Sequence, residues 1–376
     1  MRRESRRSDT LPTRRKGSLT PTGARAVGSP NTLAPAPAPR TEQELDERLS
    51  RPTEGVIDTL ARQPGDIIVL GAAGKMGPTL AMMARRALDV LGRQDRVIAV
   101  SRFSNPAMAE RLETAGVSIV RCDLTSRDAV WTLPDAPNVI FMAGQKFGTS
   151  DSASLTWVAN TVVPAICAGR FKRSRIVAFS TGNVYPLAPA NGNGAREETP
   201  LAPIGEYAAS CVGRERVLEH YASRNKTPLA IVRLNYAIDL RYGVLSDIAR
   251  KVWQGEPVDV AMGYVNVIWQ GDANARALQC LDHAAVPPFV INVTGMERVG
   301  VRALAERFGA LLDRTPRIVG EESPDALLSD ASRSARIFGE PSVDLDSMIA
   351  WVAEWTRSGG PLLGKPTHFE TRDGRF

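Results

Sequence analysis

The feature that most constrains the fold of this chain is a glycine-rich loop at residues 71–77, which reads Gly-Ala-Ala-Gly-Lys-Met-Gly. The apolar run at 66–70 is typical of a buried parallel strand. After the loop, apolar residues recur at helical spacing from 80 to 91, with Pro78 in the first turn and Gly92 at the end. A strand, a tight turn and a helix in this order let a pyrophosphate approach the backbone at a helix N-terminus. The sequence therefore predicts a dinucleotide site rather than an ordinary strand-to-helix turn. Its expected cofactor contacts in the loop are Gly71, Gly74, Lys75, Met76 and Gly77.

Strand-like runs recur along the chain, with helix-like intervals between them. Each run is short, apolar and partly β-branched, and they cover residues 97–100, 117–120, 139–142, 176–179 and 229–234. This alternation predicts an α/β fold, with a doubly wound parallel sheet of the Rossmann type. Ligands of such sheets lie at the carboxyl ends of the strands, so the residues that follow each strand are the candidates for the site.

The residues after the second and third strands indicate which cofactor is bound. The second strand ends in Ser101 and Arg102, at a point where a carboxylate would bind the adenosine ribose hydroxyls and repel a 2′-phosphate. Arg102 can instead pair with that phosphate, which favours NADP over NAD, although it can also be a solvated surface residue. The third strand leads to Asp123 and Leu124, where a carboxylate and a backbone amide can meet the adenine edge. A plain turn aspartate is the alternative interpretation of Asp123.

A tyrosine far downstream points to a family. Tyr207 and Cys211 belong to a Tyr-Ala-Ala-Ser-Cys segment that looks like the Tyr-x-x-x-Lys centre of a short-chain dehydrogenase, with Cys211 in place of the lysine. Over about residues 65–360, the chain resembles the extended short-chain dehydrogenase/reductase family, the NAD(P)-dependent sugar epimerase and dehydratase group. Motifs that match in the expected order are the glycine loop, Asp123, 142–144, Asn160, 180–185, the stretch from Arg233 to Arg241, 267–272 and 291–295.

The resemblance implies roles for particular residues. Ala143 and Gly144 would line the cofactor after the fourth strand, and Asn160 matches the family asparagine on the following helix. Thr181 takes the position of the catalytic hydroxyl and Tyr207 that of the catalytic tyrosine. The implied substrate contacts, of which the last two can equally be surface or structural residues, are Lys146, Asn235, Arg241 and Gln270.

The missing lysine leaves the role of Tyr207 open. In the family, the tyrosine exchanges a proton with a substrate hydroxyl, a serine or threonine orients that oxygen, and hydride passes to or from the nicotinamide. The family lysine also lowers the tyrosine pKa from about 10, a charge effect that Cys211 cannot supply. Tyr207 can be an oriented donor, or a structural residue in an inactive protein. It can also be a working acid/base whose cation comes from elsewhere, the candidates being Lys75, Lys146 and Arg214.

Together these features predict an NAD(P)-dependent epimerase, dehydratase or dehydrogenase that acts on a hydroxyl or keto carbon of a sugar-like metabolite. The alternative is a dinucleotide-binding regulatory or scaffold protein that has lost turnover. Cys211 favours the alternative, whereas Thr181 and Tyr207 favour the enzyme.

The expected domains follow the same resemblance. Residues 65–240 form the nucleotide-binding domain, which is completed by about 267–295. A smaller C-terminal lobe, made of 241–266 and 296–376, binds the substrate. Residues 41–64 form a helical lead-in.

The basic character of the chain comes from its first 40 residues. Residues 1–40 carry nine lysines and arginines against two acidic residues, and the remainder is close to neutral. Ala-Pro repeats and the lack of apolar periodicity predict a disordered extension. It is either a transit peptide or a non-structural extension upstream of the true start. The folded body therefore has no basic excess for nucleic acid.

Other classes of protein are excluded by patterning. No apolar run reaches the roughly 18 residues that a membrane span requires, so we expect a cytoplasmic protein that binds neither membranes nor nucleic acids. The four cysteines and three histidines are dispersed, which predicts reduced thiols and no metal. The resemblance adds a small-molecule substrate and a homodimer.

Overall fold

The structure is a computed structural model that describes residues 37–146, 152–365 and 367–375. The extension predicted to be disordered lies, as far as residue 36, outside the described residues. Two short helices follow it, α1 (Glu42–Leu49) and α2 (Glu54–Arg62). Thr41 and Thr53 cap them, because each side chain accepts a hydrogen bond from the backbone N–H three residues further on.

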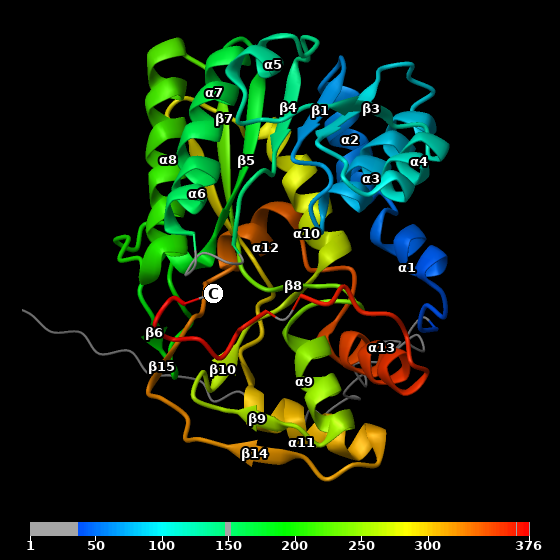
Figure 1. The fold of residues 1–376 in the computed structure, drawn as a ribbon, viewed down its shortest axis with the longest axis vertical. Helices are drawn as coiled ribbons and strands as arrows, with labels where there is room; N and C mark the ends of the chain where they lie inside the picture. The colour runs from blue at the N-terminus through cyan, green and yellow to red at the C-terminus, as the bar shows by residue number, and fades with distance from the viewer. Residues whose placement is uncertain (1–36, 147–151, 366, 376) are drawn as a thin grey trace, which may run out of the picture. The chain divides into compact units, whose positions relative to one another are not determined.

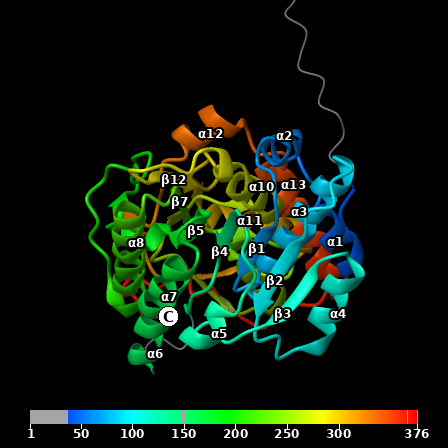
Figure 2. The ribbon, with the colours of Figure 1, turned by 90° about the horizontal axis from the view of Figure 1, so that it is seen from above.

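The centre of the fold is a sheet of seven parallel strands in the order β12-β7-β5-β4-β1-β2-β3 (Figure 2). The strands are β1 (Ile67–Leu70), β2 (Val97–Ser101), β3 (Ser118–Arg121), β4 (Asn138–Phe141), β5 (Arg175–Thr181), β7 (Leu229–Leu234) and β12 (Phe289–Val293). The strand order reverses between β1 and β4, which is the switch point where sheets of this kind bind ligands. The predicted doubly wound α/β fold is confirmed.

Helices cover both faces of the sheet, as Figure 2 shows. Alternate residues of β1 enter different cores: Ile67 and Val69 pack with α2, α3 and α10, whereas Ile68 and Leu70 pack with α5, α7 and α8. Burial on both faces explains why the inner strands are mostly continuous apolar runs. The helices of this part are α3 (Gly77–Val90), α4 (Pro106–Thr114), α5 (Arg127–Trp131), α6 (Ala153–Trp157), the π-helical η1 (Val158–Val162), α7 (Val163–Arg170), α8 (Gly205–Asn225), α10 (Gln270–Gln279) and the 3-10 turn η3 (Cys280–Asp282).

A second core joins α1 to three later helices, α9 (Val244–Gln254), α11 (Val301–Leu312) and α13 (Leu345–Arg357) (Figure 1). Leu45 and Leu49 of α1 pack there, so the helical lead-in belongs to both parts of the molecule: α2 packs on the sheet and α1 on this second core. The remaining elements are η2 (Gly182–Val184), α12 (Ser332–Phe338) and four short strand pairs, β6 (Ala188–Pro189) with β15 (Asp325–Ala326), β8 (Ala237–Ile238) with β11 (Ile268–Trp269), β9 (Pro257–Asp259) with β14 (Arg317–Val319), and β10 (Tyr264–Val265) with β13 (Val299–Gly300).

After α13 the chain returns across the second core, as the red trace in Figure 1 shows. The Leu363 N–H donates to the Arg241 carbonyl at 3.0 Å. The Thr367 N–H donates to Oδ2 of Asp247 on α9 at 2.7 Å. These contacts bring Thr367 to the edge of the cavity described next.

Candidate active site

A cavity of about 250 Å³ opens at the carboxyl ends of β1, β4, β5 and β7, where the sheet meets the second core. It lies at the position that the sheet topology predicts for a ligand. Residues predicted for the site that line this cavity are Gly71, Gly74, Lys75, Met76, Gly77, Gly144, Lys146, Thr181, Tyr207 and Asn235. The structure therefore brings together residues from five separate stretches of the sequence.

The glycine loop has the geometry that a phosphate site requires. Gly71 has a φ of 87°, in the left-handed region, and a Cβ atom there would lie 2.6 Å from the Ala143 nitrogen. A side chain at Gly77 would collide with the Ala72 carbonyl. Helix α3 begins at Gly77, and its N-cap residue Met76 gives no side-chain cap, which leaves the first N–H groups of the helix for another acceptor. This arrangement suits a pyrophosphate.

Lys75 projects from the loop toward the second core. Its Nζ donates to the Ala237 carbonyl at 2.8 Å and lies 4.0 Å from the ring centroid of Tyr242. Burial lowers the pKa of Lys75 to about 7, and the positive charge of Lys146 acts in the same direction. An anion bound in the cavity would therefore stabilise the charged form of Lys75 and raise its pKa.

Lys146 approaches from the other side of the cavity, after β4. Its Nζ donates to the Thr367 carbonyl at 3.3 Å. Burial lowers the pKa of Lys146 to about 8, while the nearby Asp247 carboxylate opposes that shift. Asp247 also accepts hydrogen bonds from Thr367. Two lysines thus line one cavity, and the nearby carboxylates of Asp239 and Asp247 offset part of their charge.

Thr181 and Tyr207 meet as the resemblance implies. Thr181 ends β5, Tyr207 lies in the first turn of α8, and their side chains are hydrogen-bonded to each other. Thr181 Oγ1 accepts from the Asn183 backbone N–H at 3.2 Å, so its own hydroxyl hydrogen can point to the tyrosine. Burial raises the pKa of Tyr207 far above its ordinary value. Thr181 therefore orients a phenol whose burial favours the protonated form.

Cys211 lies one helical turn after Tyr207 on α8 and belongs to the small core against which the Tyr207 ring packs. Its side chain is fully buried and hydrogen-bonded to Tyr207. Burial raises the pKa of the Cys211 thiol, which keeps the group neutral. As expected, this position supplies no cation.

Asn160 lies behind the residues that line the cavity. Its side chain is fully buried in η1 and is not part of the lining. Its amide oxygen accepts from the Gln145 N–H at 3.1 Å and from Arg214, and its Nδ2 donates to the Gln145 carbonyl at 3.1 Å and to Ser210 at 2.8 Å. These four bonds fix the chain after β4 against α8. The predicted contact of Asn160 with the cofactor stays a prediction.

A buried ionic network lies behind the catalytic pair. Glu215 of α8 is paired with Arg233 of β7 at 2.7 Å, and both side chains are at most 5% exposed. Glu215 also accepts from Ser180, next to Thr181, and Arg233 donates to the Tyr185 hydroxyl at 2.8 Å. The network therefore joins α8 to the ends of β5 and β7, the elements that carry Tyr207 and Thr181.

The predicted adenine-side residues lie at the neighbouring strand ends, beyond the cavity lining. Ser101 is half-buried and Arg102 exposed at the end of β2. Asp123 accepts from the Thr125 N–H at 3.0 Å and from its hydroxyl at 2.8 Å, and these bonds lower the pKa of Asp123, with a smaller contribution from the charge of Arg102. The two charged groups are thus neighbours, while Leu124 is buried. Their cofactor roles stay predictions.

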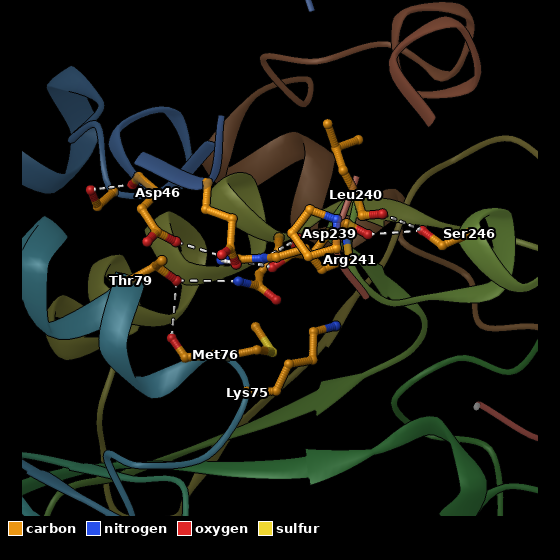
Figure 3. Close-up of polar contacts among 12 residues, drawn as sticks. Asp46, Lys75, Met76, Thr79, Asp239, Leu240, Arg241 and Ser246 are labelled. Atoms are coloured by element: carbon orange, nitrogen blue, oxygen red, sulfur yellow. Dashed lines mark hydrogen bonds and ion pairs between the residues drawn. The ribbon is translucent and has the colours of Figure 1, made fainter. Parts of the chain in front are cut away.

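Two predicted substrate contacts have structural partners instead. The Arg241 guanidinium is buried between Asp239, at 2.8 Å, and Asp46 of α1, at 2.9 Å (Figure 3). Gln270 is fully buried and donates to Thr79 of α3 at 3.2 Å. Neither residue lines the cavity. The Arg241 guanidinium is thus paired with carboxylates, whereas the Gln270 amide nitrogen donates to a helix hydroxyl and its Oε1 has no hydrogen-bond partner among the described residues.

Sequence reasoning missed several cavity residues. Tyr236 lines the cavity with a φ of 43°, an unusual conformation for a bulky side chain. Tyr242 and Thr367 line it from the second core and the C-terminal segment. Tyr236 directly follows the motif residue Asn235, so its place in the cavity could have been predicted from the sequence. No local sequence pattern indicates that Thr367 lines the cavity.

The geometry agrees with what sequence comparison finds. The profile of the NAD dependent epimerase/dehydratase family matches residues 67–261, which include the glycine loop, Thr181 and Tyr207. The chain belongs to this family. No curated protein sequence matches the chain.

Solved structures with the same fold cover most of the chain. DesIV, a dTDP-glucose 4,6-dehydratase from Streptomyces venezuelae with NAD bound, superposes with a TM-score of 0.67 at 18% identity, over 78% of this chain and 97% of its own. Pal from Bacillus thuringiensis superposes with a TM-score of 0.65 at 19% identity, over 78% of this chain and 99% of its own. UDP-glucose 4-epimerase from Thermus thermophilus in complex with NAD superposes with a TM-score of 0.64 at 18% identity, over 78% of this chain and 99% of its own. At these identities, the likeness is one of fold.

The part of the chain that the structure describes contains no helix long and apolar enough to cross a membrane. Within those same residues, no group of three or more histidine, cysteine, aspartate or glutamate side chains could hold a metal ion. The cytoplasmic location and the homodimer stay predictions.

Proposed function

We propose that this protein is an NAD(P)-dependent oxidoreductase of the epimerase/dehydratase type, acting on a hydroxyl or keto carbon of a sugar-like metabolite. The observation that carries the proposal is the hydrogen-bonded pair of Thr181 and Tyr207 in the same cavity as the glycine loop. The family membership supports the class of reaction. The sugar-nucleotide enzymes among the similar structures support the class of substrate.

The residues present fit a dinucleotide. Gly71, Gly74 and Gly77 allow backbone approach at the start of α3, where the pyrophosphate would lie, with the ammonium of Lys75 close by. Gly144 lines the cavity after β4. When bound, the dinucleotide would accept or supply hydride.

The remaining chemistry is a proton transfer by this chain's own side chains. When a substrate hydroxyl is oxidised, the ionised Tyr207 oxygen takes its proton, and when a ketone is reduced, the Tyr207 hydroxyl returns it. Thr181 donates to the same phenol and so holds it in one orientation. On the substrate side, Lys146 and Asn235 line the cavity and are the proposed polar contacts.

The proposal is tested on the purified full chain. Native mass spectrometry should detect a bound dinucleotide, or calorimetry should show one binding. Incubation with a panel of nucleoside-diphosphate sugars should then give an epimerised, dehydrated or oxidised product. Absence of binding to both NAD and NADP would contradict the proposal.

A regulatory or scaffold protein is the second candidate, and Cys211 is the observation that favours it. A neutral thiol at the lysine position removes the usual activator of the tyrosine. Under this alternative the dinucleotide binds but no sugar nucleotide is converted, so the turnover assay separates the two.

We expect NADP to bind more tightly than NAD, because Arg102 lies exposed at the end of β2 with no carboxylate at that position. A charge-assisted pair with the 2′-phosphate is worth about 1.5–3 kcal/mol before solvent screening. Calorimetric titration of both dinucleotides into wild type and Arg102→Ala measures the preference. Arg224→Ala, which removes an exposed arginine of α8, is the control. Equal affinities in the wild type would remove this claim.

Dinucleotide affinity should fall as the pH rises above about 7. Burial holds the pKa of Lys75 at about 7 in the free protein, and a bound phosphate raises it, so binding takes up a proton. The affinity is then constant below pH 7 and falls by at most about tenfold per pH unit above it. The charged groups around Lys75 are Asp239, Lys146, Arg241 and Asp247.

Calorimetry in buffers of different ionisation enthalpy measures that proton uptake directly. Lys75→Gln should bind more weakly below pH 7 and lose most of the pH dependence between pH 7 and 8, while Lys172→Gln, at an exposed lysine, should behave as wild type. A pH dependence that survives in Lys75→Gln would assign it to another group, with Lys146 the next candidate.

A further inference from the structure

One cation of the cavity, Arg214, lies on the same helix as Tyr207. Arg214 lies on α8, seven residues after Tyr207 and three after Cys211, so all three residues share one helix face. Its side chain is only 6% exposed and lines the cavity. Its guanidinium is a planar, delocalised cation.

The Arg214 guanidinium is fixed rather than mobile. One terminal nitrogen donates to the Phe179 carbonyl of β5 at 2.9 Å, and the other donates to the Asn160 amide oxygen. The place it occupies exists only because residue 144 is glycine: a Cβ on Gly144 would collide with the guanidinium. Asn160 is itself held by Gln145 and Ser210.

The charge of Arg214 is not cancelled by a carboxylate. Both of its hydrogen-bond partners are neutral oxygens, and its Nε has none, although it is buried. The adjacent Glu215 is committed to Arg233 and Ser180. Among the described residues, no ion pair joins Arg214 to an acid. The field of this cation is therefore available to the phenol and thiol beside it, and it lowers the pKa of both Tyr207 and Cys211.

We propose that Arg214 is the positioning cation of the catalytic centre and replaces, from seven residues after Tyr207, the lysine that the family places four residues after it. This inference rests on the proposed role of Tyr207 as acid and base. In the oxidation step, the substrate O–H proton moves to the Tyr207 oxygen while the carbon-bound hydrogen leaves as hydride to the dinucleotide. Arg214 gains and loses no proton; it stabilises the tyrosinate that exists before the transfer.

The test measures the acidity of residue 207 without any turnover. A polyfluorinated tyrosine, whose phenol ionises at lower pH than tyrosine, is incorporated at position 207 of the full chain. Its ionisation is followed by absorbance and fluorine NMR, with and without dinucleotide. The informative pair is Arg214→Gln, which keeps N–H donors but removes the charge, and Arg214→Lys, which keeps the charge but loses the planar fork.

We expect Arg214→Gln to raise the pKa of the fluorotyrosine by about one unit or more, and Arg214→Lys to change it by less than about half a unit. The double variant Cys211→Lys/Arg214→Gln should restore the lower value, because it returns a cation to the face of Tyr207. Arg216→Gln, on the exposed face of the same helix, is the matched control and should have no effect. Equal pKa values in Arg214→Gln and wild type would overturn the inference.

The inference can be tested even if one of the variants does not fold. Thermal melting checks every variant, and if Arg214→Gln does not fold, Asn160→Asp takes its place, since it neutralises the guanidinium with a side chain of the same size. The readout is also independent of the proposed function. A protein with no activity on any sugar nucleotide refutes the enzyme, whereas an active protein whose fluorotyrosine ignores Arg214 refutes this inference alone.

Discussion

Replacing Tyr207 by phenylalanine is expected to lower turnover by about 10²- to 10⁴-fold, the usual contribution of a positioned acid or base. The substitution removes one oxygen atom and its proton and keeps the ring that fills the space above Cys211. Dinucleotide affinity should stay within about twofold, because the phosphate site is built from the glycine loop on another element. Steady-state rates on an identified substrate and calorimetry with the dinucleotide give the two numbers.

Tyr221→Phe is the matched control for that variant. Tyr221 lies on the same helix but packs with α7 and the sheet, away from the cavity. Its hydroxyl can be removed without touching the proposed chemistry. Full activity of Tyr207→Phe would show that Tyr207 is structural and that the proton passes through another group.

The second large effect concerns the buried pair of Glu215 and Arg233. Arg233→Met should lower the free energy of unfolding by about 3–5 kcal/mol, because it leaves the Glu215 carboxylate buried without its cation. The Tyr185 hydroxyl loses a donor in the same step. Chemical denaturation measures this loss of unfolding free energy, provided that its dependence on denaturant concentration is the same in the variant and the wild type. Activity should fall with stability, since the pair joins the elements that carry Thr181 and Tyr207.

Two further variants separate the missing partner from the missing charge. Glu215→Leu/Arg233→Met removes both ions and should be less damaging than Arg233→Met alone, because no unpaired charge remains. Glu219→Gln breaks the exposed pair with Arg216 on the same helix and should cost at most about 1 kcal/mol. A loss in Arg233→Met no larger than that of Glu219→Gln would mean that the buried pair does not hold the two elements together.

The sheet could be predicted from sequence because its determinants are local. Each inner strand of the sheet is a short, mostly apolar run whose two faces are both buried, and the turn after β1 requires glycine at Gly71. The family could be recognised because motifs such as the glycine loop and Thr181 occur in a fixed order. Thr181 and Tyr207 could be paired because the motif, rather than any local preference, relates them.

The missed parts of the site depend on contacts between distant residues. Arg241 matches a family position, yet its partner Asp46 lies 195 residues earlier, on a helix outside the motif. Thr367 reaches the cavity only because the chain folds back after α13 and bonds to Asp247. Spacing along the sequence contains no information on such pairings. The role of Asn160 was obscured for the same reason, since its contact with Arg214 depends on how α8 packs against η1.

The most direct measurement of the central claim is hydride transfer within the protein. A sugar-nucleotide substrate deuterated at the reacting carbon is mixed with the protein and its oxidised dinucleotide, the reaction is quenched within the first turnover, before the hydride returns to the sugar, and the nicotinamide is analysed by mass spectrometry. We predict deuterium in the dinucleotide with wild-type protein and almost none with Tyr207→Phe. Wild-type protein that binds the dinucleotide but transfers no deuterium from any substrate in the panel would contradict the account and leave a nucleotide-binding protein without turnover.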